Sequence, residues 1–384
     1  MTINNTFSIV NTSFIVVCIT MAIVFLTLHL PPNKGLSNYR KSLRFLSGAY
    51  LTMAALNIFV TSFDISLDNF ISVEIITMAS FQAVLFAIAL IILLKPQFKA
   101  GSLMYKLLIP VLLFNILYFL VSSRWGDPEI LDFDGLIQFA FHPAMSLREL
   151  FLLYYIFQLI YLTRLFFSQV RLFEKEIDNY FGDSLLLHLP GVKYSYYAAL
   201  SIGIGALLSC FIISKQWEII FTIAYAIFYL GFCIYYIQYP YTFISLEPAI
   251  YVHENTKDEL QNPTRRINWI HLKKQILEDK YYLGNGVNIQ EMAQYLKIGR
   301  TTLSTFINND EGMNFNQWIN KLRVEEAKSL LVAYPDYNLA QIAELVGYSE
   351  ASNFSRQFKL ITTESPSVWR QNKKDKCGSI AVFV

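Results

Sequence analysis

The sequence predicts an all-α protein in which a seven-transmembrane-helix bundle is followed by a cytoplasmic domain with two helix-turn-helix units joined by a long helix. Two observations lead to this prediction. The chain of 384 residues is 54% hydrophobic and only 16% charged, with a mean hydropathy of +0.38, which is too apolar for a soluble protein of this size. Its last third instead repeats one pattern of helix-starting and apolar residues at an interval of about fifty residues.

Seven apolar segments are long enough to cross a bilayer. Each has about 20 residues or more, and a helix of that length spans a hydrocarbon core of about 30 Å. We therefore expect residues 1–240 to form an integral membrane domain in contact with the lipid bilayer. The segments are 7–30, 43–63, 71–94, 103–122, 149–167, 194–213 and 217–238.

The charges between these segments predict the orientation of the chain. Lysine and arginine are enriched in cytoplasmic loops, and they mark the loops between spans one and two and between spans three and four. We expect the protein to lie in the inner (cytoplasmic) membrane with its N-terminus outside. Because the number of spans is odd, its C-terminus is then expected in the cytoplasm. The marking residues are Lys34, Arg40, Lys41, Arg44, Lys95, Lys99 and Lys106, opposed by Asp64, Asp68, Asp127, Glu129, Asp132 and Asp134 in the alternate loops.

The segments expected outside the membrane are short. The longest, 123–148, has about 25 residues, and a folded sensor domain needs roughly 40. An unknown signal ligand would therefore be recognised within or close to the bilayer, where polar side chains are candidates for function. Those near the outer ends of spans can equally be interfacial anchors. The polar side chains are Asn57, Glu74, Gln82, Asn115, Arg148, Glu149 and Gln158.

Residues 241–264 have prolines, little periodicity and a polar second half, which is typical of a linker. After them we expect a folded domain over 265–375 and a tail over 376–384. The domain begins with a helix over 265–283. A continuous helix over 315–332, with apolar residues at helical spacing, is expected to join the two repeated units.

The second repeated unit, 338–370, has the pattern of two helices joined by a tight turn. Asn338 and Gln341 form a helix-start pair, Gly347 can end the first helix, and Ser349 can cap the second. The first unit, 288–309, repeats this pattern, with Asn288 and Glu291 as its helix-start pair. The inward residues of the second unit are Ile342, Ala343, Val346, Phe354, Phe358 and Ile361.

The second helix of each unit carries a polar face that can enter a major groove. Arginine can bind guanine through two hydrogen bonds, and small hydroxyl and amide side chains can contact other base edges. An ordinary solvated helix pair is the alternative interpretation. The candidate DNA-binding residues are Arg300, Thr301, Ser304, Thr305 and Asn308 in the first unit and Ser352, Asn353, Ser355, Arg356 and Lys359 in the second.

The closing motif resembles the DNA-binding domain of the AraC/XylS transcription regulators. It reads IA..VGYS..S.FSR.FK......P..WR and follows a joining helix of the form F..W....R...A..LL. The resemblance covers about 110 residues, and it implies two recognition helices in successive major grooves, double-stranded promoter DNA as the partner and contact with RNA polymerase. The chain departs from the family pattern at Thr305, where an arginine is usual, at Asn308, where a lysine is usual, and at Thr363, where a glycine is usual.

Three classes of function follow. The first is a membrane-tethered one-component transcription regulator. The second is a membrane transporter or receptor whose helix-turn-helix domain is a protein-interaction module, which the departures at Thr305 and Asn308 favour. The third, an intramembrane enzyme, lacks paired catalytic residues. We expect no catalytic residue, no cofactor and no metal, because the four cysteines have no metal-ligand spacing and no nucleotide or protease motif is present.

Span 194–213 contains small residues at intervals of four. Ser201, Gly205 and Ser209 would let another helix approach closely. Packing within one bundle and contact with a second chain, giving a homodimer, both explain this stripe.

Overall fold

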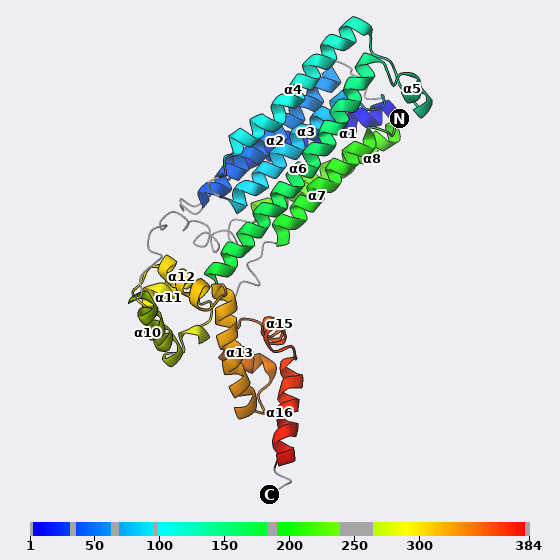
Figure 1. Cartoon of the computed structure of the whole chain (residues 1–384). Helices are drawn as coiled ribbons and strands as arrows, with labels where there is room; N and C mark the ends of the chain where they lie inside the picture. The colour runs from blue at the N-terminus through cyan, green and yellow to red at the C-terminus, as the bar shows by residue number, and fades with distance from the viewer. Residues whose placement is uncertain are drawn as a thin grey trace. The chain divides into compact units, whose positions relative to one another are not determined.

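The computed structural model describes residues 3–30, 36–62, 69–95, 98–182, 190–238 and 264–380 (Figure 1). These residues are helical, apart from connecting turns and one isolated antiparallel bridge between Phe181 and Asn288. The all-α prediction is therefore confirmed. The chain divides into two compact units, one made of Met1–Arg171 with Leu189–Pro248 and the other of Leu172–His188 with Ala249–Val384. The predicted linker lies almost entirely outside the described residues.

The first unit is built from long apolar helices. Hydroxyl and carboxylate side chains cap several of them: Ser72 accepts a hydrogen bond from the backbone N–H of Ile75, and Ser214 accepts one from that of Trp217. The helices are α1 (Ile3–Thr27), α2 (Ser37–Ser62), α3 (Val73–Leu94), α4 (Ala100–Trp125), α5 (Phe133–Gln138), α6 (Pro143–Tyr180), α7 (Pro190–Ser209) and α8 (Lys215–Ile237). Helix α6 contributes residues to both units.

Six of the described helices are long and apolar enough to cross a membrane, namely α1, α2, α3, α4, α6 and α8. They are compatible with a membrane anchor and correspond to six of the seven predicted spans. Helix α7 occupies most of the predicted span 194–213 but is not among the six. Tyrosines, serines and glycines interrupt its apolar sequence, and a seventh span stays a prediction.

Helix α3 is the most buried of the apolar helices and packs against α2, α4 and α7. Helix α4, in contrast, is largely exposed, and its large apolar side chains form much of its surface; Phe119 is 70% exposed. An apolar exterior of this kind is unfavourable in water and is typical of a helix that contacts lipid.

Arg148, on α6, is 1% exposed and binds residues of the loop that follows α4. It forms an ion pair with Asp127, and it donates hydrogen bonds to the Tyr118 hydroxyl at 2.9 and 3.1 Å and to the Phe70 carbonyl at 3.3 Å. A buried charge needs such compensation. Arg148, one of the intramembrane candidates, therefore has a structural role in this conformation.

Two of the three small residues predicted on α7 face another helix of the same unit, whereas Ser201 is exposed. A Cβ added to Gly205 would lie 2.6 Å from the Phe221 ring of α8, and the Ser209 hydroxyl accepts a 2.9 Å hydrogen bond from the Trp217 indole. Gly205 and Ser209 are thus packed within the chain. For these two residues the contacts favour packing within one bundle, because α8 makes the close approach that they permit; a homodimer stays a prediction.

The second of the two compact units contains both helix-turn-helix units. The first helix-turn-helix unit is α11 (Ile289–Tyr295) with α12 (Arg300–Asp310), and the second is α14 (Leu339–Leu345) with α15 (Ala351–Thr362). Figure 1 shows α13 between the two. The remaining elements are α10 (Thr264–Glu278), the short 3-10 helix η3 (Tyr281–Leu283), the joining helix α13 (Phe315–Ala333) and the closing helix α16 (Pro366–Ile380).

The predicted helix starts are confirmed in both units. The Asn338 side chain accepts from the Gln341 N–H while the Gln341 side chain accepts from the Asn338 N–H, and Asn288 accepts from the Glu291 N–H. Asn314 and Gln317 form a further pair of this kind at the start of α13. One prediction differs from the structure, since the N-cap of α15 is Glu350 and not Ser349.

Gly347 ends α14, as predicted, with φ at +85°. It also satisfies a packing constraint that the turn alone does not impose. A Cβ at this position would lie 2.4 Å from the Leu283 carbonyl oxygen and 2.9 Å from a guanidinium nitrogen of Arg323. Only glycine fits both the backbone angle and the space.

Candidate nucleic-acid interface

The apolar face of α15 closes a core with α13 and α14. Phe354 and Phe358 are both fully buried, and they pack with apolar residues of the joining helix and of α14. Arg323 of α13, also fully buried, donates hydrogen bonds to the Tyr282 and Gly284 carbonyls at 2.8 and 2.7 Å. This core determines which side of α15 is left at the surface.

The exposed side of α15 carries most of the DNA-binding residues predicted for the second helix-turn-helix unit. Ser352, Arg356 and Lys359 are exposed and Ser355 is half-buried. The Ser352 hydroxyl donates to the Glu350 carboxylate at 3.0 Å. Two cations therefore lie on one helix face opposite a rigid core, which is the geometry needed to present a guanidinium to a major groove.

Asn353 is placed differently from the other predicted residues, since it is only 3% exposed. Its side-chain oxygen accepts a 3.3 Å hydrogen bond from a guanidinium nitrogen of Arg356. Asn353 thus lies beneath the surface and orients Arg356. The remaining N–H groups of the Arg356 guanidinium can bind a partner.

The corresponding face of α12 is less basic. Thr301 and Asn308 are exposed, and Ser304 and Thr305 are half-buried. The Thr305 hydroxyl donates back to the Thr301 carbonyl at 2.8 Å, and the Asn308 amide donates to the Ser304 hydroxyl at 3.2 Å. These groups satisfy one another along the helix, so this face offers hydrogen-bonding groups but no exposed cation within Arg300–Asp310.

Arg300 is the cation of α12, and the structure places it against another segment. Its guanidinium lies 4.9 Å from the centre of the Tyr180 ring, and one of its terminal nitrogens is buried without a hydrogen-bond partner among the described residues. Burial lowers the pKa of Arg300 from its ordinary value, while the neighbouring Tyr180 and Glu176 oppose this shift. The group stays charged, because an arginine pKa is far above neutral.

The segment that covers Arg300 is the last part of α6 together with Phe181 and Gly182, here called the docked segment (residues 172–182). The Gly182 N–H donates to the Val287 carbonyl at 2.8 Å. Its carbonyl accepts from the amides of Asn316 and Asn320 at 3.1 and 3.2 Å, and the Phe181 carbonyl accepts from Asn316 at 3.1 Å. The start of the joining helix is therefore tied to the docked segment.

Sequence reasoning missed the docked segment, because residues 172–182 were assigned to the membrane domain. Two signals could have pointed to it. Asn316 and Asn320 lie four residues apart on a helix whose other inward residues are apolar, and a buried amide needs a partner. Gly182 is the other signal, since a Cβ there would lie 3.0 Å from a methyl carbon of Ile319.

Comparisons with known proteins identify the helix-turn-helix domain that carries these residues. Residues 292–372 match the family described as "Helix-turn-helix domain". The chain is 25% identical over 125 residues to the regulatory protein PocR of Salmonella typhimurium (strain LT2), covering 32% of this chain and 41% of PocR. It is 30% identical over 96 residues to the raffinose operon transcriptional regulatory protein RafR of Pediococcus pentosaceus, covering 25% of this chain and 34% of RafR.

A third relative is an uncharacterized HTH-type transcriptional regulator of Staphylococcus aureus (strain COL), 30% identical over 87 residues, which are 23% of this chain and 12% of that protein. The chain thus spans less than half the length of each of these relatives. No solved structure matches it at a significant level. Taken with the motif and the geometry, these matches show that residues 292–372 form a helix-turn-helix domain of the AraC family of transcription regulators.

Proposed function

We propose that the protein is a membrane-tethered one-component transcription regulator. In this proposal residues 1–240 anchor the chain and sense a signal in or near the membrane, and residues 265–375 bind specific promoter DNA. The observation that carries the proposal is the exposed face of α15, where Arg356 and Lys359 lie opposite a closed core within a domain that regulators share.

The proposed topology has seven spans, with the N-terminus outside and the DNA-binding domain in the cytoplasm. The six long apolar helices support an anchor, and the packing of α7 against α3 and α8 supports its place in the same bundle. The Tyr155 hydroxyl of α6 also donates to the Gly203 carbonyl of α7 at 2.9 Å. A seventh crossing by α7 brings the C-terminal domain to the side opposite the N-terminus.

The second helix-turn-helix unit is proposed to carry more of the base discrimination than the first. Arg356 is exposed and oriented by Asn353, while the first unit has Thr305 at the equivalent place and Arg300 covered by Tyr180. The other proposed contacts are the exposed or half-buried residues Thr301, Ser304, Asn308, Ser352, Ser355 and Lys359. RNA polymerase and a second copy of the chain remain proposed partners.

The test is selection of random DNA duplexes by the full chain in lipid nanodiscs. A regulator should enrich one sequence motif over successive rounds. Arg356→Ala should weaken binding to the selected site by about 1–3 kcal/mol and relax the preference at one base pair. Lys274→Ala is the matched control, because Lys274 is an exposed cation of α10 that pairs with Glu278 at 3.6 Å; it should change the preference at no base pair.

The alternative is a membrane transporter or receptor whose helix-turn-helix domain binds a protein. The face of α12 favours it, because that face has no exposed cation and its polar groups bond to one another. The same selection separates the two functions. Failure of the full chain to enrich any motif, with the domain folded, would contradict the regulator and favour the interaction module.

A further inference from the structure

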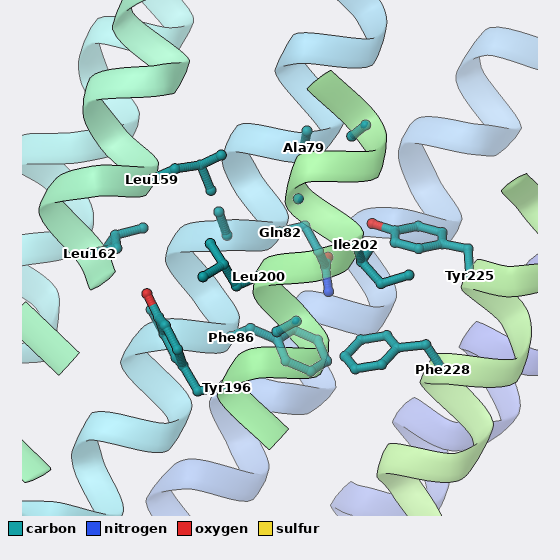
Figure 2. A pocket seen from close by; sticks show the side chains of 15 residues that line it. Ala79, Gln82, Phe86, Leu159, Leu162, Tyr196, Leu200, Ile202, Tyr225 and Phe228 are labelled. Atoms are coloured by element: carbon teal, nitrogen blue, oxygen red, sulfur yellow. The ribbon is translucent and has the colours of Figure 1, made fainter. Parts of the chain in front are cut away.

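A small pocket lies inside the first unit, between α3, α6, α7 and α8 (Figure 2). It leaves about 40 Å³ for the centres of water-sized groups, within a cleft of about 510 Å³ that includes space open to the surroundings. This space is enough for about three such groups. Its walls are mostly apolar and aromatic, and they include Phe86, Leu159, Tyr196, Tyr225 and Phe228.

Gln82 of α3 projects among these apolar walls, as Figure 2 shows. The residue is 7% exposed, and neither its amide nitrogen nor its amide oxygen has a hydrogen-bond partner among the described residues. A carboxamide can donate two hydrogen bonds and accept two. Leaving all of them unmade in a buried site is unfavourable, and native proteins rarely do so. An occupant of the pocket would relieve this cost.

The lining also limits the charge of the occupant. It contains no Asp, Glu, Lys, Arg or His among the residues that the structure describes. An ionised group would be desolvated there without a counter-charge, which is strongly unfavourable. The polar part of the occupant must therefore be neutral and small, and it must offer a donor and an acceptor close together.

The space exists because α7 has small residues at this level. Ala199, Gly203 and Ala206 line the pocket. A Cβ added to Gly203 would lie 3.2 Å from Leu159 and 3.3 Å from the Tyr155 hydroxyl, so the backbone of α7 is already close to α6 at that point. The small residues of α7 therefore permit close packing against α6 and also leave a void next to Gln82.

We infer that this pocket binds an uncharged amphiphile whose head group carries an adjacent hydrogen-bond donor and acceptor, a carboxamide in the simplest case, and whose apolar chain lies along the aromatic walls. The head group pairs with the Gln82 carboxamide in a cyclic arrangement of two hydrogen bonds. That this ligand is the signal rests on the proposed regulator function. Leu159 and Leu162 of the lining belong to α6, the helix whose last residues form part of the docked segment.

The test uses the full chain in phosphatidylcholine nanodiscs, without DNA. Its probes are decanamide, which has both donor and acceptor, and decane, which has neither. Decanamide should raise the thermal unfolding temperature in a concentration-dependent manner, because a ligand that binds only the folded state stabilises it. Gln82→Leu should lower the affinity for decanamide at least tenfold and leave that for decane unchanged or higher.

Gln158→Leu is the matched control. Gln158 is fully buried on α6 but lies outside the pocket lining, and its amide donates to the Leu107 carbonyl at 3.4 Å. This variant should bind decanamide like the wild type. Ala199→Phe, which fills the pocket and keeps Gln82, should abolish decanamide binding.

Two results would overturn the inference. One is equal affinity of decanamide for the wild type and Gln82→Leu. The other is no effect of decanamide on the wild type, in which case bound water alone satisfies Gln82. Because binding is read without DNA, either failure leaves the regulator proposal standing, and failure of the duplex selection leaves the pocket standing.

Discussion

Replacement of Gly182 tests whether the docked segment is held by the contacts described above. In Gly182→Val the new Cβ would lie 3.0 Å from a methyl carbon of Ile319 and 3.1 Å from the Val287 carbonyl oxygen, so the backbone must move away. The movement breaks the bond from the Gly182 N–H to Val287 and the two bonds that Gly182 accepts from Asn316 and Asn320.

The expected magnitude follows from these three bonds. A net contribution of about 1 kcal/mol each gives a loss of about 2–4 kcal/mol in the free energy that holds the segment in place. The rest of the domain keeps its core, since Phe354 and Phe358 do not contribute to this contact. The change is therefore local, and at tenfold per 1.4 kcal/mol it corresponds to opening that is roughly thirtyfold to several hundredfold more frequent.

Hydrogen–deuterium exchange of the full chain in nanodiscs measures this opening. Peptides that contain the backbone N–H of residue 182 should exchange faster by that factor, while peptides from α14 and α15 should not change. Gly299→Ser is the matched control in the same domain, because a Cβ there makes only an ordinary 3.5 Å contact with the Thr302 hydroxyl. An unchanged exchange rate at residue 182 in the valine variant would refute the reasoning.

Three further predictions follow from other contacts. Tyr180→Ala uncovers Arg300, so the dependence of log affinity for DNA on log salt concentration should become steeper by about one unit, as for one added phosphate contact; an unchanged slope would mean that Arg300 does not reach DNA. Asp127→Asn leaves the buried Arg148 guanidinium without its counter-charge and should destabilise the first unit by about 1–3 kcal/mol in a denaturant titration, whereas no change would show that the pair is dispensable. Asn338→Ala removes the cap of α14 and should lower the unfolding free energy of the C-terminal domain by about 1 kcal/mol in the same denaturant titration, whereas Asn338→Ser should stay close to wild type.

The local features of the second helix-turn-helix unit could be predicted from the sequence, because they depend on residues three or four positions apart. The Asn338–Gln341 pair, the glycine at 347 and the Phe354/Phe358 face are all of this kind, and each is found as predicted. The long apolar helices of the first unit were predictable for the same reason, since length and composition suffice to recognise them.

The first helix-turn-helix unit shows where this reasoning stops. Its helices and its cap are as predicted, but the sequence pattern cannot tell that Arg300 is covered, because Tyr180 is far away in the chain. The burial of Asn353 has the same origin. A helical wheel places it on the flank of α15, and only the packing of that helix decides that the flank is covered.

The sequence by itself determined which segments become helices, where the helix-turn-helix units begin and end, and which residues are candidates for contact with DNA, since these depend on local spacing and side-chain chemistry. Only the tertiary structure decided which of those residues are free to do so, which polar groups find partners, as Arg148 does, and which do not, as with Gln82. The physical reason is that burial and hydrogen bonding of a side chain depend on segments distant in sequence, and no local pattern records which of them will meet.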